Sequence, residues 1–506
     1  MEHNATQHTR AQMEWMTRTV PLEWTAEITL PDYRSEISRL LWVRPTFSVP
    51  GRFIGNGKVD FSGTVRYGML YVGPDGLLYS AEEEVPYDFS VPLDGGTGID
   101  DLTLCVELLP DAVVSRVAAP RRLTLRCRLR ARMRGYIGRE LAPRLEGESA
   151  GEPLQLCEAT SAVCVLAGTG DAVTLTEELL ADAGEDLRVI TARGEVFLPE
   201  VIAGDDVVRC KGEVICSVLC ARESEGAEGT PFLLTKRLPL SQTVPVDGAR
   251  PDCDARATGT VEEITATVEN GRVQLSVGLM LEAEARWESP VCYTRDLFLP
   301  RAAAEYRHRT ERLCHHRGCG NRNFSVSGEL SPESIGMPVE AEVLLVTAEA
   351  EVRECAVENG RTAVAGDVRC HLLYKYGREY QTAEGSIPFR VVLEEAFPEV
   401  DCRVAVPLCR VNEAKERLRV DAELQLAFCA VAPEEVRMIA EATLSPTAPV
   451  ARAGMEICYP QAGETLWEVA KRCGVAPGDL ALKNGISGEA PGEADSLRGV
   501  RYLLLP

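Results

Sequence analysis

The sequence lacks the features that assign many proteins to a functional class at first sight. No run of 18 uncharged apolar residues occurs in it, so we expect no transmembrane segment. Its first 16 residues do not pass from basic to apolar as a signal peptide does, and we expect the protein to be cytoplasmic. It has six histidines, none between residues 152 and 290, and no GxSxG, HExxH or P-loop motif. These absences predict a protein that is not an enzyme and uses no cofactor.

Positive charge is also scarce. There are 77 acidic and 54 basic residues, which give a formal net charge of −23. Such a field repels phosphate backbones, so we expect no nucleic-acid partner. The 506 residues exceed what one hydrophobic core normally serves, which predicts several domains. The 18 cysteines are predicted to be reduced thiols, and Cys210, Cys216 and Cys220, which share one parity along a strand, are expected in a core.

One segment runs against the overall charge. In "RLTLRCRLRARMRG", residues 122–135, apolar and polar side chains alternate, which is the pattern of a half-buried strand. We consider two alternatives for its basic outer face. It is a solvated face that opposes aggregation, or it docks on an acidic surface of another domain, another copy or a partner protein. The arginines of this possible docking face are Arg126, Arg128, Arg130, Arg132 and Arg134.

The chain contains a threefold internal repeat. The segments "FSGTVRYGMLYVGPDGLLYSAEEEVPYDFSV", "CKGEVICSVLCARESEGAEGTPFLLTKRLPLSQTV" and "VAGDVRCHLLYKYGREYQTAEGSIPFRVVL" align. Each has a glycine before an alternating strand, then a polar turn, then a proline before a second apolar run. Because the glycines lie about 150 residues apart, each repeat is a domain rather than a solenoid unit. The shared residues are Gly63, Gly212 and Gly366, and Pro86, Pro239 and Pro388.

The repeats predict antiparallel, mainly β domains. Asn270-Gly271 and Asn359-Gly360 separate alternating runs and are typical of type I′ hairpin turns. The basic face belongs to the first repeat alone, since the matching outer positions of the other repeats differ in charge. Those positions are Glu282, Glu284 and Arg286 in repeat two, and Arg419, Asp421 and Glu423 in repeat three.

The last fifty residues follow a different pattern. A short strand reaching Tyr459 and a final strand in "RYLLLP" flank two predicted helices. The helices are expected from Glu464 or Thr465 to Gly474, and from Pro477 to Asn484-Gly485 with Leu480 and Leu482 buried. The predicted division is an N-terminal extension 1–18, repeats 19–140, 152–290 and 291–433, a linker 434–455 and a βααβ domain 456–506.

This C-terminal segment resembles a LysM domain through "AGETLWEVAKRCGVAPGDLALKNGI" and "GVRYLLLP". In that family a shallow groove between two loops binds glycans that contain N-acetylglucosamine. Three departures from the family pattern count against a glycan ligand here: Glu464 in place of aspartate, Val500 in place of glutamine, and the longer acidic loop "SGEAPGEADS". The resemblance places the groove at Gly463, Glu464, Thr465, Leu466, Asn484, Gly485 and Ile486.

Ahead of such a module, the three repeats are similar to SPOCS domains over roughly residues 20–433. The whole architecture resembles the SipL type of spore-coat morphogenetic protein. The resemblance implies a scaffold that tethers the spore coat to the forespore surface from the mother-cell cytoplasm. It also implies a partner, the basement-layer spore coat ATPase (stage IV sporulation protein A), which the LysM domain is implicated in binding. The alternative is a LysM protein that binds peptidoglycan.

One cluster contains zinc-ligand chemistry. In "HRTERLCHHRGCGN" neutral imidazole and thiolate groups could converge from a loop. The C-x₄-C spacing lies outside the usual zinc pattern and no second pair is near in sequence, so we favour a polar interdomain loop and predict no metal. A metal-dependent enzyme centred on residues 308–319 is the remaining alternative. The candidate ligands are His308, Cys314, His315, His316 and Cys319.

Overall fold

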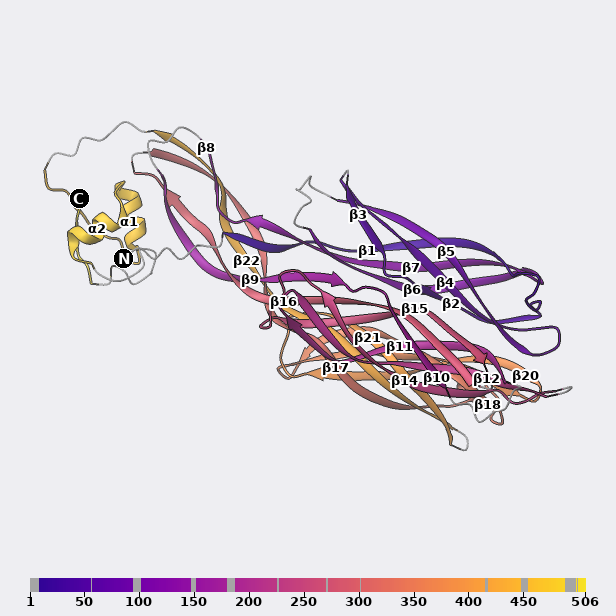
Figure 1. The fold of residues 1–506 in the computed structure, drawn as a ribbon. Coiled ribbons are helices and arrows are strands. Elements are labelled where there is room, and N and C mark those ends of the chain that lie inside the picture. Colours follow the sequence, from indigo (N-terminus) through magenta and orange to yellow (C-terminus); the bar gives the residue numbers. More distant parts are fainter. Residues whose placement is uncertain are drawn as a thin grey trace.

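The structure is a computed structural model that describes residues 9–55, 57–93, 102–146, 152–179, 187–224, 227–269, 272–300, 302–414, 417–446, 454–486, 497 and 499–506. It is mainly β, with two short α-helices near the C-terminus (Figure 1), so the predicted fold class is confirmed. The predicted turn at Asn270-Gly271 and the acidic loop 487–496 lie outside the described residues.

The first sandwich consists of two antiparallel sheets. One has the strand order β1-β7-β6, and in the other β4 pairs with β2, β3 and β5. The apolar side chains that alternate along β7, from Leu123 to Met133, all point into the core between the sheets, as predicted. The strands are β1 (Arg10–Thr29), β2 (Arg39–Phe47), β3 (Gly51–Gly55), β4 (Lys58–Val72), β5 (Leu78–Pro92), β6 (Thr103–Ala119) and β7 (Arg122–Glu140).

The second sandwich has the same topology. Its last strand, β16, pairs with β15 on one side and with β9 and β10 on the other, while β12 pairs with β11, β14 and the short β13. The strands are β9 (Leu154–Thr169), β10 (Val173–Leu179), β11 (Leu187–Gly204), β12 (Val207–Ser224), β13 (Ala227–Glu228), β14 (Phe232–Pro245), β15 (Asp254–Glu269) and β16 (Arg272–Phe298).

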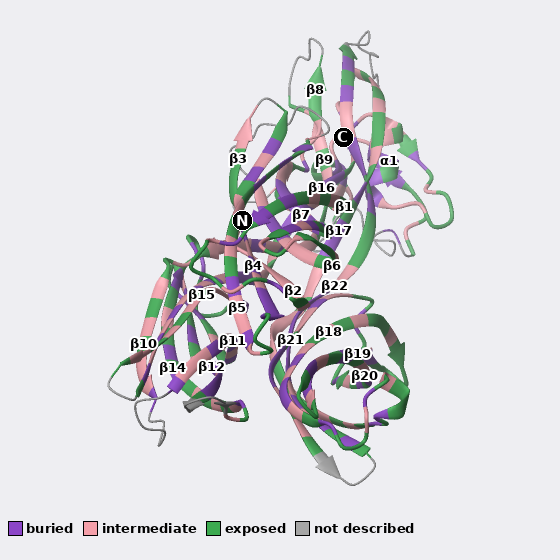
Figure 2. Ribbon diagram, turned by 90° about the vertical axis from the view of Figure 1, so that its right-hand side faces the viewer, coloured by how far each residue is buried: buried purple, intermediate pink, exposed green. Residues whose placement is uncertain are grey.

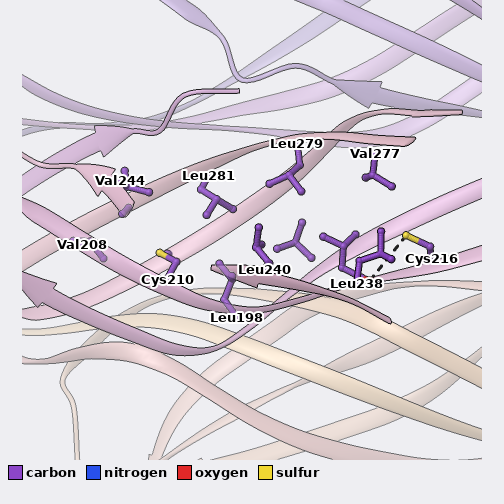
Figure 3. Packing of buried hydrophobic residues seen from close by; sticks show 14 of the residues in the cluster. Leu198, Val208, Cys210, Cys216, Leu238, Leu240, Val244, Val277, Leu279 and Leu281 are labelled. Carbon is purple, nitrogen blue, oxygen red and sulfur yellow. Dashed lines mark hydrogen bonds between the residues drawn. The ribbon is translucent and has the colours of Figure 1, made fainter. Parts of the chain in front are cut away.

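Figure 3 shows the core of this second sandwich, where side chains of the two sheets face each other. Cys210 and Cys216 lie among leucines and valines there, and with Cys220 they are fully buried, which confirms the predicted core face. Burial raises the pKa of Cys210 and Cys216 to about 12 each. These thiols therefore act as small apolar side chains.

The third sandwich repeats the arrangement once more. One sheet has the order β17-β22-β21 and the other β18-β19-β20. The turn between β18 and β19 has Asn359 at φ 50° and Gly360 at φ 76°, which confirms the two-residue hairpin expected there. The elements are β17 (Ala302–Leu330), the 3-10 helix η2 (Glu333–Ile335), β18 (Glu342–Glu358), β19 (Arg361–Tyr376), β20 (Glu379–Leu393), β21 (Glu399–Ala414) and β22 (Arg417–Pro446).

The internal repeat is also a repeat of strand register. In each copy the residue after the shared glycine lies opposite the shared proline. Each proline is on a strand at the edge of its sheet, where a missing backbone N–H is tolerated. The pairs are Thr64 with Pro86, Glu213 with Pro239, and Asp367 with Pro388.

Steric contacts explain why the three repeats share a glycine at this position. A Cβ atom at Gly212 would lie 1.9 Å from the carbonyl oxygen of Phe197, and one at Gly366 would lie 2.0 Å from that of Glu351. The register of the neighbouring strand shifts beside both contacts, so a bulge brings its backbone towards the central strand. At Gly63 the group in the way is the Tyr87 side chain, whose hydroxyl oxygen would lie 2.5 Å from the added atom.

The three sandwiches pack around one another (Figure 2). The first and last strands of each continue past its own core as a two-stranded ribbon. The ribbons meet around an apolar cluster to which all three contribute. Its members are Ala11, Met13, Leu141, Ala162, Val291, Tyr293, Leu313, Val436 and Met438.

A second apolar cluster joins the other sheets of the three sandwiches. It receives side chains from β4 and β5 of the first sandwich, from β11 and β12 of the second, and from β18, β19 and β20 of the third. Burial of this kind across two separate clusters favours one rigid body over three loosely linked domains. The members are Leu70, Val72, Leu78, Ile190, Leu219, Ala221, Leu344, Leu345, Leu373 and Tyr380.

Several predicted domain limits fall inside strands. β1 begins at Arg10, within the predicted extension 1–18, and β16 continues through the limit between 290 and 291. β22 continues through the limit at 433 and into the predicted linker 434–455. The reason is that the ribbons pack on other sandwiches rather than in their own core. Between the first two sandwiches, β8 (Arg144–Glu146) pairs in parallel with β22.

Candidate functional site

The C-terminal module contains β23 (Ile457–Cys458), α1 (Leu466–Cys473), α2 (Pro477–Asn484) and β24 (Leu503–Leu504). Thr465 caps α1, because its hydroxyl accepts a hydrogen bond from the Glu468 N–H at 3.2 Å. The Glu468 carboxylate in turn accepts from the Thr465 N–H at 2.8 Å, which completes a capping box. Gly474, at φ 64°, ends the helix. The start and end predicted for the first helix are confirmed.

The second helix also lies where it was predicted, but one of its side chains does not. Pro477 opens α2 and Gly485, at φ 65°, ends it. Leu480 is fully buried, whereas Leu482 is 84% exposed, so the prediction that both are buried is wrong. Residues two positions apart in the sequence are about 200° apart around a helix, so Leu480 and Leu482 lie on opposite sides of α2.

The residues predicted to form a groove lie at the start of α1 and the end of α2. Leu466 and Ile486 belong to one apolar cluster, so the two loops meet in the module core. Asn484 holds the end of α2 against β24, since its amide donates to the Leu504 carbonyl at 2.8 Å and its oxygen accepts from the Leu504 N–H at 2.7 Å.

The polar side chains of the first loop are also held internally. Glu464 accepts two hydrogen bonds of 2.9 Å from Arg472, and this partner lowers the pKa of the carboxyl group. Thr465 is occupied as the cap of α1, and Gly463, at φ 82°, turns the chain. In the described parts of these loops, residues 463–466 and 484–486, few polar side chains are therefore free to bond to a ligand.

The module docks on the body through α1. Trp467 is 4% exposed, and its indole N–H donates to the Asp296 carboxylate at 2.9 Å. The Lys471 ammonium lies 2.6 Å from the other Asp296 oxygen and 4.9 Å from the centroid of the Tyr306 ring. The Phe298 ring meets Trp467 edge-on, with 5.0 Å between centroids. Trp467 is thus an anchor between module and body and is not an open sugar platform.

The outer face of the two strands of the module carries exposed apolar side chains, which the sequence reasoning missed. β23 and β24 pair with Ile457 opposite Leu504, and alternation turns Cys458 and Leu503 inward. Outward-facing residues of these strands and their continuations are strongly exposed: Met455 81%, Ile457 47%, Tyr459 69% and Tyr502 56%. Exposed apolar surface of this kind marks interaction sites. Met455, Ile457 and Tyr459 recur at every second position of "MEICY" and so share one strand face, which was the signal that could have found this surface.

The arginine face of β7 lies partly against the third sandwich. Along the strand, the acidic partners of these arginines change from residues of the first sandwich to residues of the third. Arg134 is 12% exposed and Arg126 is 60% exposed, so the face passes from solvent into an interface. The ion pairs are Arg126 with Glu23, Arg130 with Asp111 and Glu351, Arg132 with Glu107 and Asp401, and Arg134 with Asp401.

This face continues into a buried charge network that joins all three sandwiches. Arg256, 3% exposed, donates to Asp401 at 2.7 Å and to Glu284 at 2.6 Å. Arg286, 2% exposed, donates to Glu284 at 2.7 Å and to the Tyr136 hydroxyl at 3.4 Å. Glu284 and Arg286 lie on the face of β16 that points away from its own core, as expected, and other sandwiches cover that face.

The network fixes the charge of its acids. Burial alone would raise the pKa of Asp401, but Arg256 and Arg134 outweigh it and hold that pKa well below the usual value. The same balance of burial against Arg256 and Arg286 lowers the pKa of Glu284. Both carboxylates are therefore ionised and paired across the interface.

A cavity of about 230 Å³ lies where the three sandwiches meet. Its lining includes Ser48, Thr258, Thr260 and Gln425, and the charged side chains of Glu107, Glu282 and Arg403. The Arg403 Nε lies 3.1 Å from a Glu107 carboxylate oxygen across its wall.

The predicted zinc candidates lie on β17, which is a strand and not the expected loop. A register shift between His316 and Gly318 breaks the alternation of this strand, so the sequence does not identify it as one. His315 bonds to Glu288 and Glu434, and His316 bonds to Asp254.

The other candidates point to different partners. Cys314 is buried beside Tyr136, the His308 ring meets Tyr306, and Cys319 lies 2.7 Å from the sulfur of Cys429. The five residues do not converge. Within the described ranges, three or more His, Cys, Asp or Glu residues are nowhere grouped as a metal site.

Two segments match a known family. Residues 187–269 and 341–412 match the model described as SipL, SPOCS domain. The first match covers β11 to β15 of the second sandwich, and the second match covers β18 to β20 and most of β21 of the third. The SPOCS likeness is thus shown for these two repeats. No curated protein and no solved structure matches the chain. Neither described helix is long and apolar enough to cross a membrane.

Proposed function

We propose that the protein is a non-enzymatic scaffold of spore coat assembly, which tethers the coat to the forespore surface from the mother-cell cytoplasm. The observation that carries the proposal is the match of two of its three sandwiches to the SPOCS domain of the SipL family. That family suggests a role connected with the coat of the spore. The first sandwich shares the topology and the strand register of the matched ones.

The packing of the body supports a scaffold. Two apolar clusters and one buried charge network connect the three sandwiches. The module is attached to one end of this body by α1 (Figure 1). A rigid body with a small module at its end suits a protein that holds other components at a fixed separation.

The electrostatics support a structural role over a catalytic one. Asp401, Glu284 and Arg256 have strongly displaced pKa values, and each has another member of the same network as its partner. Such groups are fully committed to holding domains together.

We assign the binding of a protein partner to the C-terminal module, which we identify with LysM. The polar side chains at the predicted groove, Glu464, Thr465 and Asn484, are engaged inside the module. Glycan recognition needs polar groups that can bond to sugar hydroxyls, so this favours a protein ligand. The exposed side chains of Ile457, Tyr459 and Tyr502 supply apolar surface for it.

The proposed partner is the basement-layer coat ATPase, stage IV sporulation protein A, arrayed as a polymer on the forespore. A module of modest affinity becomes an effective tether when many copies bind one polymerised surface. The SPOCS sandwiches would then hold further coat protein. The alternative hypothesis is that the module binds peptidoglycan, and one experiment distinguishes a protein ligand from a glycan ligand.

Co-sedimentation of the full chain tests the proposal. The protein is mixed with the polymerised ATPase in one tube and with purified peptidoglycan in another. The variant Tyr459→Asp alters the exposed sheet face, and Tyr33→Asp is its matched control, since Tyr33 is 82% exposed on the first sandwich. We expect wild type and Tyr33→Asp to sediment with the ATPase, and Tyr459→Asp to bind at least about tenfold more weakly.

Each other outcome has a definite meaning. Sedimentation with peptidoglycan alone would replace the tether with a glycan-binding protein. Sedimentation with neither would remove both functions from the module. Equal binding by the two tyrosine variants would keep the tether but move its interface away from β23 and β24.

A further inference from the structure

Two cysteines of the third sandwich face each other across the edge where its sheets meet. Cys355 is on β18 and Cys402 is on β21, and their sulfur atoms lie 3.6 Å apart. These strands belong to different sheets. A disulfide needs about 2 Å between the sulfurs, so forming the bond requires the two sulfurs to move about 1.5 Å closer.

Exposure distinguishes Cys355 from every other thiol. All 18 cysteines are described, and Cys355 is the one that is exposed. Cys402 is 8% exposed, directly behind it. An accessible thiol with a second thiol in reach is the arrangement of a nucleophilic and a resolving cysteine.

The surroundings favour a thiolate at Cys355. A hydrogen bond from Cys402 lowers the pKa of Cys355 most, and the Arg132 guanidinium adds to this effect. Burial, Asp401 and Glu354 oppose it but do not prevail. The same hydrogen bond raises the pKa of Cys402, which keeps the resolving thiol protonated until it is needed. The thiolate is the reactive form in disulfide exchange.

We propose that Cys355 and Cys402 form an oxidisable dithiol site that reacts with a low-molecular-weight disulfide and closes to a disulfide between the two sheets. The Cys355 thiolate attacks one sulfur of the small disulfide RSSR, forming a mixed disulfide and releasing RS⁻. Cys402 loses its proton to that thiolate and attacks the Cys355 sulfur, which releases the second RS⁻. The second RS⁻ takes a proton from solvent, which balances the proton that Cys355 lost to solvent when its thiolate formed. Counted from the two thiols, the protein loses two electrons and two protons, and RSSR becomes two RSH.

The bond would stiffen a particular place in the molecule. It would join β18 to β21 and close the chain between residues 355 and 402 into a loop, which raises stability. Asp401, next to Cys402, contacts Arg134 of the first sandwich and Arg256 of the second. Oxidation would therefore stabilise the strand that holds the interdomain charge network.

Two other thiol pairs make internal controls. The sulfurs of Cys319 and Cys429 are 2.7 Å apart and those of Cys458 and Cys473 are 3.3 Å apart. Both pairs are closer than Cys355 and Cys402, but neither contains an exposed thiol. If proximity decided the reaction they would oxidise first, whereas access to a thiolate predicts the opposite order.

The test uses the full chain, reduced and then exposed to glutathione disulfide near pH 7.5. Samples are alkylated at intervals, digested without reduction and examined by mass spectrometry. We expect the peptides of Cys355 and Cys402 to become linked at least about tenfold faster than either control pair. The Cys402→Ser variant should accumulate glutathione on Cys355, and Cys355→Ser should leave Cys402 reduced over the same time. The oxidised wild type should also melt at a higher temperature than the reduced one.

Three results would overturn the proposal. They are earlier oxidation of either control pair, a lasting glutathione adduct on Cys355 in wild type, and no reaction at Cys355. Circular dichroism checks that the variants fold. If Cys402→Ser does not fold, the order of the wild-type time course together with Cys355→Ser, which alters an exposed residue, decides the question.

Discussion

Replacing Asp401 with asparagine is expected to loosen the contact of the third sandwich with the other two. Asp401 lies on β21, and its carboxylate is paired with Arg134 of β7 and Arg256 of β15. The substitution keeps the shape of the side chain and removes its charge. Around Glu284 it leaves three guanidinium groups, Arg134, Arg256 and Arg286, with a single acid among them.

The size of the effect follows from burial. Arg256 is 3% exposed and the Asp401 side chain 15%, so solvent screens the pair weakly. Removing one partner of a buried ion pair costs about 3–5 kcal/mol. Asparagine still offers an oxygen to Arg256, so we expect the lower end, about 3 kcal/mol, which is about a hundredfold in an equilibrium constant.

The pH dependence has a definite sign. Because the folded pKa of Asp401 is depressed, its contribution is complete above the unfolded value of about 3.9 and is lost as pH falls through the folded pKa. The difference between wild type and Asp401→Asn should therefore be constant from pH 7 to about pH 5. It should shrink only in stronger acid, where the wild type loses the charge as well.

Hydrogen exchange measured by mass spectrometry reports this opening locally. Peptides from β7 and β21 should exchange faster in Asp401→Asn, by up to about a hundredfold if separation of the sandwiches limits exchange. The control is Asp252→Asn, whose ion pair with Arg250 is exposed, at 71% for the aspartate, and surface pairs contribute about 0–1 kcal/mol. Exchange in Asp401→Asn within about twofold of this control would refute the view that the network holds the sandwiches together.

Two further predictions concern single positions. Gly212→Ala places a Cβ atom 1.9 Å from a backbone carbonyl oxygen of β11, so thermal unfolding should show the second sandwich destabilised by about 3 kcal/mol or more. Gly278→Ala is the control, because its Cβ atom meets only ordinary contacts and should cost about 1 kcal/mol or less. Burial disfavours the charged form of His315, but hydrogen bonds to Glu434 and Glu288 outweigh burial and raise its pKa. The stability lost in His315→Gln should therefore be largest near pH 6 and should decline as pH rises through the folded pKa. The control is His371→Gln, because His371 is more exposed.

Local patterns in the sequence were sufficient for the elements that face a single core. Strict alternation from Leu123 to Met133 specified the inward face of β7. Asn359 and Gly360 specified their hairpin, because both positions need positive φ. Thr465 and Gly474 specified the limits of α1. In each case the cause lies within a few residues of the effect, so the sequence carries it.

Residues with a second covered face escaped the same reasoning. Glu284 and Arg286 alternate with buried residues of β16 and so resemble a solvated face, yet both are buried. Their partners, Arg256, Asp401 and Tyr136, come from distant parts of the chain. Strand alternation tells which side of a strand a residue occupies. It does not tell whether another domain covers that side.

The divergence of the three repeats follows from the same geometry. The inner faces of β7, β16 and β22 meet equivalent cores and keep an apolar pattern, whereas their outer faces meet different neighbours. Along β7 this difference appears within one strand, since the same residue type is a surface charge at Arg126 and an interface charge at Arg134. A threefold copied domain that packs around itself cannot keep identical outer faces, because like charges would then meet where the copies touch. The acids that the arginines of the first sandwich meet on the third, Glu351 and Asp401, come from β18 and β21 and not from the strand that corresponds to β7.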